Sequence, residues 1–301
     1  MPTIQVEQIS KTFGTLKAVN NVSFEVEAGE IFGLLGPNGA GKTTSLRIIL
    51  DIFKPDSGKV SILGGAMTEE KKNCIGYLPE ERGLYQDIPL ERCLVYLATL
   101  KGIEQTDAKK RVSAYLERFD LADCRKKKVK ELSKGMQQKA QLITTLVHDP
   151  QIVIIDEPFS ALDPVNTQMV KDLLLEQRAG GKTIVMCTHQ MHQVEELADR
   201  IALIDKGSTM LYGPLDAIRR QFSTAAITVR TAGVFPASLP GVSEIVRHNH
   251  HFSLHLEKGK TSQDILRSLL ELQVPIEQFE IALPTLDEIF IQVVGQERPS
   301  S

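Results

Sequence analysis

The sequence predicts an α/β fold with a smaller antiparallel β subdomain, a helical insertion and a small C-terminal α+β domain. Over the first ~210 residues, short apolar runs alternate with helical stretches, and the runs end in Gly-rich or acidic turns. Strands that are buried on both faces form continuous apolar segments, which is typical of a parallel sheet covered by helices. The chain has 301 residues, which is enough for about two domains.

The predicted core contains four buried strands, which in chain order are 31–35, 151–155, 182–187 and 201–204. Helical stretches lie between them, notably 164–178 and 190–198. Earlier in the chain, polar and apolar residues alternate at 3–9, 22–26 and 59–63. Alternation is typical of strands with one buried face, so these segments predict the smaller antiparallel sheet.

Residues 87–148 show helical periodicity and no strand pattern, which predicts a helical insertion carried on the core. The chain changes character after Gly213 and Pro214, so we predict two domains, 1–213 and 214–301. The elements expected in the second domain are a helix at 215–221, strands near 225–230, 242–247 and 252–257, a helix at 262–272, a strand at 275–282 and a last helix from Pro284.

Composition and charge exclude several classes of protein. The formal net charge of −3 shows no basic surplus, which argues against nucleic acid as a partner. The four cysteines are scattered without a C-x-x-C pair, which argues against a zinc site or a disulfide framework and favours a reducing cytosol. No signal peptide is predicted, and no apolar run approaches the ~20 residues needed to cross a bilayer. Any membrane role is therefore expected to come through a partner.

A glycine-rich motif at 36–44 follows the first buried strand, opens a helix, and matches G-x-x-x-x-G-K-[ST]. Glycines let successive backbone N–H groups surround a phosphate, the Lys42 ammonium adds positive charge for the β- and γ-phosphates, and the Thr43 hydroxyl can ligate Mg²⁺. A glycine-rich loop without a ligand is the alternative, which the strand–helix context disfavours. The predicted nucleotide-binding residues of this motif are Gly36, Asn38, Gly39, Gly41, Lys42, Thr43 and Thr44.

Two acidic residues complete the predicted site. Asp156 follows the apolar run 152–155 and can hold Mg²⁺ directly or through water. The adjacent Glu157 points to a different position, where it can polarise an attacking water. Alone, such a pair could be a helix N-cap and its neighbour. Together with the phosphate loop, it predicts a nucleoside triphosphatase whose kind is still open.

The segment Leu132-Ser133-Lys134-Gly135 opens a helix predicted to run to about His148. Ser133 is a natural N-cap, and a helix N-terminus is a second site for an anion. With this segment the chain resembles the ABC ATPase family, whose signature L-S-G-G-Q precedes the Asp-Glu strand by about this distance. The resemblance implies a P-loop ABC ATPase core with a mixed sheet, ATP and Mg²⁺ as cofactors, and Ser133 and Gly135 as contacts to ATP held by the opposite subunit.

Further positions agree with the family. Residues 160–163 resemble the loop that runs along the dimer interface, and His189 resembles the switch histidine that contacts the γ-phosphate, so we assign it a catalytic role beside Glu157. Phe13 takes the place of the aromatic residue that stacks on adenine. A structural histidine and an apolar packing role for the phenylalanine are the respective alternatives.

Two departures from the family pattern are present. Lys134 and Met136 replace the usual Gly and Gln of the signature, and Glu80 stands where a Gln is usual. A glutamate can still bind Mg²⁺ or water, so Glu80 is included among the predicted metal contacts. These departures and the ending 283–290 resemble a bacterial subgroup of sodium- or drug-export ATPases that carry a C-terminal extension.

The resemblance implies a peripheral subunit on the cytoplasmic face of a bacterial-type cell membrane, with an integral-membrane permease as its partner. It also implies a head-to-tail homodimer, with a heterodimer as the alternative. A groove near Leu84, Tyr85 and Gln86 is expected to receive a helix of the permease. The subgroup implies export, and nothing in the sequence names the cargo.

Other classes fit less well. A DNA-repair or chromosome ATPase usually has long coiled coils or zinc modules between the phosphate loop and the signature, and neither is present here. A translation-factor type would carry two such cassettes in one chain. The segment 248–251 contains three histidines that could bind a metal, but a hairpin cap between two strands is the favoured interpretation.

Overall fold

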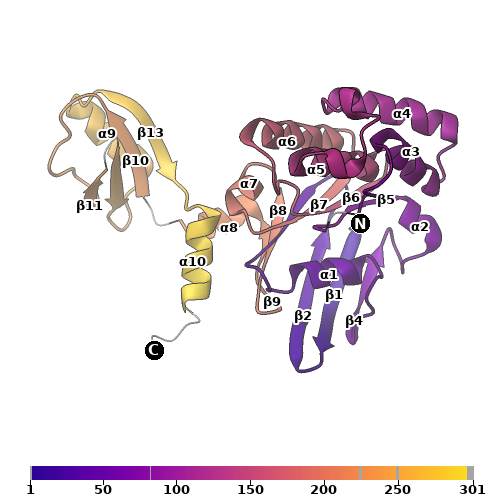
Figure 1. The fold of residues 1–301 in the computed structure, drawn as a ribbon. Helices are drawn as coiled ribbons and strands as arrows, with labels where there is room; N and C mark the ends of the chain where they lie inside the picture. Colours follow the sequence, from indigo (N-terminus) through magenta and orange to yellow (C-terminus); the bar gives the residue numbers. More distant parts are fainter. Residues whose placement is uncertain (1, 82, 224–225, 249–250, 297–301) are drawn as a thin grey trace. The chain divides into compact units, whose positions relative to one another are not determined.

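The computed structural model describes residues 2–81, 83–223, 226–248 and 251–296. The chain divides into two compact units, Met1–Leu215 and Asp216–Ser301, and each is described by itself. Figure 1 shows the first unit as two sheets with helices packed against them. Within the described residues, no helix combines the length and the apolar character needed to span a bilayer.

The main sheet of the first unit has six strands in the order β5-β6-β7-β3-β8-β9. The strands β5, β6, β7, β3 and β8 are parallel to one another, and β9 pairs antiparallel with β8 at one edge. This mixed sheet confirms the predicted fold class. The strands are β3 (Ile31–Leu35), β5 (Ile75–Leu78), β6 (Ile152–Asp156), β7 (Thr183–Thr188), β8 (Arg200–Asp205) and β9 (Ser208–Pro214).

Strands β3, β6 and β7 are buried along their whole length, as continuous apolar runs require. Two strands of this sheet, β5 and β9, were not predicted. Strand β5 has only four residues and includes Gly76, where a Cβ would lie 2.2 Å from the Thr145 carbonyl oxygen. Strand β9 is a partly exposed edge strand that ends in Gly213 and Pro214, so it lacks the apolar run of its neighbours.

The smaller sheet is antiparallel, with the order β2-β1-β4, as predicted. Its strands are β1 (Ile4–Phe13), β2 (Leu16–Val26) and β4 (Ser57–Ile62). Strand β2 begins at Leu16, earlier than the predicted 22–26. Its first half is largely exposed and shows no strict alternation of polar and apolar residues, so the sequence pattern did not identify it as a strand. Phe24 of this sheet stacks on Phe32 of the main sheet at 5.2 Å between ring centroids, so the two sheets share one apolar core.

Helices of the first unit cover the main sheet and form the predicted helical region (Figure 1). Between 87 and 148 the described residues contain α3, α4, α5 and two short 3-10 turns, with no strand. The helices are α1 (Lys42–Ile49), α2 (Glu69–Asn73), α3 (Leu90–Leu100), α4 (Gln105–Arg118), α5 (Lys134–Leu146), α6 (Pro164–Ala179) and α7 (Met191–Glu195).

The second unit is an antiparallel sheet with helices. Its strand order is β11-β12-β10-β13, and α9 packs its buried face on the apolar residues of the sheet. Thr261 caps α9 in a reciprocal pair with Asp264, which satisfies two otherwise free backbone donors. The elements are α8 (Leu215–Gln221), β10 (Ala226–Thr231), β11 (Val242–Arg247), β12 (Phe252–Leu256), α9 (Ser262–Glu271), β13 (Ile276–Ala282) and α10 (Leu286–Gln296).

Candidate nucleotide-binding and hydrolysis site

The phosphate loop joins the end of β3 to the start of α1. Gly41, the residue before α1, has φ 103°, and a Cβ there would lie 2.2 Å from the Ala18 carbonyl oxygen. Only glycine fits such a position without a shift of the backbone. The Lys42 side chain is buried, and its Nζ donates to the carbonyl oxygens of Gly36 at 2.8 Å and Pro37 at 3.0 Å. The ammonium group is therefore held over the loop whose N–H groups would surround a phosphate.

Asp156 and Thr43 meet across the sheet edge. The Thr43 hydroxyl donates to Asp156 Oδ2 at 2.9 Å, and Asp156 is only 2% exposed. No ion pair to this carboxylate exists within the described part of the chain. The pKa of Tyr77 is raised to about 12, mainly by burial and to a smaller extent by the nearby Asp156 carboxylate. The negative potential of Asp156 therefore extends to its neighbours. Hard oxygen donors around an uncompensated buried charge suit Mg²⁺.

Glu157 is held more tightly than its position at a strand end requires. Its backbone has φ 53°, a strained conformation for a residue that is not glycine. The Thr188 hydroxyl donates to Glu157 Oε2 at 2.9 Å, and the His189 backbone N–H donates to Oε1 at 3.1 Å. His189 Nδ1 lies 2.6 Å from Oε1, and since a carboxylate only accepts, the ring nitrogen donates. The Nε2 atom of His189 is therefore left for another partner.

Most of the predicted site residues line one cavity of about 380 Å³. Gly36 and His189 do not line it but contact residues that do: the Gly36 carbonyl oxygen accepts from Lys42, and the His189 ring bonds to Glu157. Phe13 lies at the rim, 43% exposed, with its ring edge-to-face against Phe53 at 5.5 Å. The lining consists of Phe13, Leu16, Ala18, Asn38, Gly39, Gly41, Lys42, Thr43, Thr44, Glu80, Asp156 and Glu157.

Ser133 and Gly135 are not among the residues that line this cavity. Ser133 caps α5 as expected, because its hydroxyl accepts from the Met136 N–H at 3.2 Å. Its side chain and that of Lys134 are exposed. Gly135 faces the loop after β6, where a Cβ would lie 3.1 Å from the Ala161 carbonyl oxygen. The structure thus brings two of the three predicted motifs together in the cavity and leaves Ser133 and Gly135 outside its lining.

Two residues at the site were missed by sequence reasoning. Thr188 is fully buried at the end of β7, and its only signal was its position next to His189. Gln138 lies on the buried face of α5, and its side-chain amide donates to the carbonyl oxygens of Glu157 at 3.4 Å and Pro158 at 3.3 Å. A polar residue at a buried helical position needs a partner, and that requirement could have identified it.

Two sequence families match the chain. Residues 19–160 match the family described as ABC transporter, and residues 213–294 match the ATP-binding protein DrrA1-3-like, C-terminal domain. The uncharacterized ABC transporter ATP-binding protein YhaQ of Bacillus subtilis (strain 168) is 39% identical over 294 residues, which are 97% of this chain and 98% of that protein. This chain belongs to the ABC transporter ATP-binding proteins.

The relationship of this ABC transporter ATP-binding protein to others extends over both units. The daunorubicin resistance ATP-binding protein DrrA3 of Streptomyces coeruleorubidus is 30% identical over 98% of this chain and 96% of its own. A solved ATP-binding subunit of an ABC transporter is 31% identical, with a TM-score of 0.68, and the match covers 73% of this chain and 93% of that one. The predicted family is confirmed. The chain binds nucleotide, hydrolyses ATP and serves a membrane partner in transport.

Proposed function

We propose that two copies of this subunit pair head to tail and enclose two ATP molecules, each held by the phosphate loop of one copy and the signature of the other. The cavity that joins Lys42, Thr43, Asp156 and Glu157 is the observation that carries this proposal. It lacks any contribution from Ser133 and Gly135 of the same chain. Since the Ser133 side chain is exposed at the start of α5, a second copy can reach it. A heterodimer with a similar chain would satisfy the same geometry.

Each side chain of the cavity has a defined role in this proposal. Lys42 and the loop N–H groups bind the β- and γ-phosphates, Thr44 binds beside them, and Phe13 offers a half-exposed ring face to adenine. Glu157 accepts a proton from the attacking water, and His189 orients its carboxylate while Nε2 faces the γ-phosphate.

Mg²⁺ fits the same cavity. Thr43 and Asp156 would hold it, with Glu80 as a further oxygen ligand from the same cavity wall. When bound, the ion neutralises negative charge on the phosphates. Thr43 and Asp156 are joined here by the hydrogen bond from the Thr43 hydroxyl to Asp156 Oδ2. That bond would have to break for both oxygens to bind the ion.

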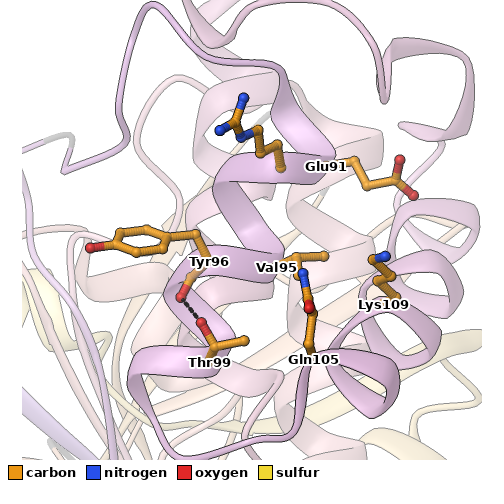
Figure 2. A pocket seen from close by; sticks show the side chains of 7 residues that line it. Glu91, Val95, Tyr96, Thr99, Gln105 and Lys109 are labelled. Carbon is orange, nitrogen blue, oxygen red and sulfur yellow. Dashed lines mark hydrogen bonds between the residues drawn. The ribbon is translucent and has the colours of Figure 1, made fainter.

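The permease is proposed to dock on the helical region. A cavity of about 680 Å³ lies between α3 and α4, and Figure 2 shows Val95, Tyr96 and Thr99 on α3 beside Gln105 and Lys109. A second cavity of about 350 Å³ shares Tyr96 with it and adds Tyr85 from the predicted groove. The exposed rings of Tyr85 and Tyr96 contact edge-to-face at 5.9 Å. Exposed aromatic residues beside a cavity are typical of protein interfaces.

Direction, location and domain boundary complete the proposal. Another relative, the Nod factor export ATP-binding protein I of Rhizobium sp. (strain N33), is named for export and is 35% identical over 71% of this chain, so we assign export. A subunit that hydrolyses cytosolic ATP for such a permease lies on the cytoplasmic face of the membrane. Residues 214–301 then form an accessory domain of the exporter.

The test combines turnover with partner capture. Glu157→Gln keeps the shape of the side chain but removes its basicity, so we expect ATP to bind while turnover falls by about 10²–10⁴-fold. The exposed residue Glu271, at the end of α9, supplies the control Glu271→Gln, which should turn over normally.

Tagged Glu157→Gln chain, purified from membranes with ATP, should recover a multi-span membrane protein in similar amount, as mass spectrometry would show. Normal turnover by Glu157→Gln would refute the assigned role. Recovery of nucleic acid or soluble repair factors instead would refute the transport partner.

A further inference from the structure

The second unit contains a cavity of its own, of about 520 Å³, at one end of its four-stranded sheet. Strand pairing brings its main residues to this end: Phe252 of β12 pairs with Arg247 of β11 on one side and with Val229, the neighbour of Arg230, on the other. His248 and His251, from the connection between β11 and β12, complete the lining. The lining consists of Arg230, Thr231, Gly233, Arg247, His248, His251, Phe252 and Glu277.

The charges around this cavity are unbalanced. Arg230 and Arg247 form no ion pair with any residue that the structure describes. The Arg247 guanidinium lies 5.9 Å from the centre of the Phe252 ring, a cation–π contact that leaves its N–H donors free for another partner. Glu277 is the sole acidic residue in the lining. The lining therefore contains two guanidinium groups and two imidazoles but one carboxylate.

Two histidines of this cavity, His248 and His251, contact each other. Their rings stack at 4.5 Å between centroids, and the His248 N–H donates to the His251 carbonyl oxygen at 2.8 Å, in agreement with the predicted hairpin cap. No group of three or more His, Cys, Asp or Glu side chains suited to a metal occurs in the described ranges. The positive charges of Arg230 and Arg247 in the same lining also disfavour a cation. Asn249 and His250 lie outside the described residues.

We propose that this cavity binds a phosphate-bearing anion. Guanidinium groups match phosphate oxygens with paired N–H donors, and two of them line this cavity. A volume of about 520 Å³ is within the range of small-molecule sites, about 300–1,000 Å³, and exceeds what a lone phosphate needs. Phe252, whose ring stacks on Phe235 at 4.1 Å between centroids, adds an apolar side chain to the lining. The source is either a soluble phosphate compound or an anionic lipid headgroup.

The absence of tryptophan from the sequence permits a local test. Phe252→Trp places a single fluorescent reporter in the cavity wall, and Lys42→Ala in the same full-length chain suppresses phosphate binding at the nucleotide site. Pyrophosphate is the soluble probe. Vesicles of phosphatidylcholine with and without phosphatidylglycerol are the lipid probe. Calorimetry on the chain with Phe252 intact checks that the reporter has not altered the site.

We expect the fluorescence to change saturably with pyrophosphate, with a Kd of about 1 mM or tighter. Arg230→Gln with Arg247→Gln should weaken this affinity about tenfold or more, because both lost contacts are charge-assisted. The control Arg267→Gln removes an exposed arginine of the same unit, on α9, and should leave the affinity unchanged.

A response to phosphatidylglycerol vesicles alone, again lost in the double variant, would assign the lipid headgroup as the source. Two results would overturn the proposal: no response to either probe, or a response that the double variant retains. Neither result depends on the nucleotide site, so the proposal can fail while the ATPase function stands.

Discussion

The Thr188 hydroxyl is predicted to position the catalytic carboxylate, and Thr188→Val tests this with almost no change in side-chain volume. Thr188 is fully buried, and its hydroxyl donates to Glu157 Oε2 at 2.9 Å while it accepts from the Gln190 N–H at 3.1 Å. Valine removes both bonds. The Glu157 carboxylate then keeps only its two contacts to His189, both at Oε1, and can rotate about that atom.

The size of the effect follows from the bond that is lost. A hydrogen bond to a charged group contributes about 1.5–3 kcal/mol, which corresponds to about 10–150-fold in rate if it is needed in the transition state. Because His189 still restrains Oε1, we expect the lower end, a loss of about tenfold in kcat. Thr188 contacts no part of the phosphate loop directly among the described hydrogen bonds, so KM for ATP should stay the same.

Steady-state ATPase assays on three variants separate positioning from general destabilisation. Thr188→Ser keeps the hydroxyl and should restore most of kcat. Thr183→Val is the matched control: Thr183 is buried at the opposite end of the same strand, where its hydroxyl accepts from the Gly29 N–H at 3.0 Å and makes no contact with Glu157 among the described hydrogen bonds. Full kcat in Thr188→Val, or an equal loss in Thr183→Val, would refute the reasoning.

Three further predictions concern the loop, the fold and the second unit. Gly41→Ala should abolish ATP binding in an equilibrium assay, because its Cβ would meet the Ala18 carbonyl oxygen at 2.2 Å; Gly39→Ala has the strain of a φ of 80° but no such clash, and should bind more tightly than Gly41→Ala. Burial lowers the pKa of His148, so the unfolded chain binds a proton that the folded chain does not, and stability to urea should fall as pH drops below about 6.5; His148→Gln should flatten that dependence. Leu254→Ala should destabilise the second unit by about 2–5 kcal/mol in calorimetry while ATP turnover persists, and parallel loss of turnover would contradict separate units.

The parts of the site that follow from local sequence could be predicted, because each motif contains its own structural reason. The glycines of 36–41 permit positive φ, and the apolar run before Asp156 requires a buried strand. The meeting of Thr43 with Asp156 was also predictable in outline. Carboxyl ends of parallel strands lie at one edge of a sheet, where ligands bind.

The role of Thr188 could not be predicted, because it depends on strand order. Strand β7 lies between β6 and β3, and Leu35 pairs with Thr188 while Asp156 pairs with Cys187. The last residue of β7 is therefore placed between the phosphate loop and Glu157. Sequence periodicity identifies buried strands but not their neighbours, so an ordinary threonine before His189 carried no sign of this contact.

Ser133 and Gly135 lie outside the cavity, but the helix at whose start they lie contacts the loop that carries Glu157. Gln138 lies one helical turn from Gly135 on α5, and its amide holds the backbone carbonyls of Glu157 and Pro158. Gly135 itself lies against Ala161 in the same loop. Packed elements move as units rather than by continuous deformation. In the proposed dimer, a phosphate that the second copy holds against Ser133 of the first would act, through α5 and this buried amide, on the backbone of the first copy's Glu157, and this contact would connect the two ATP sites.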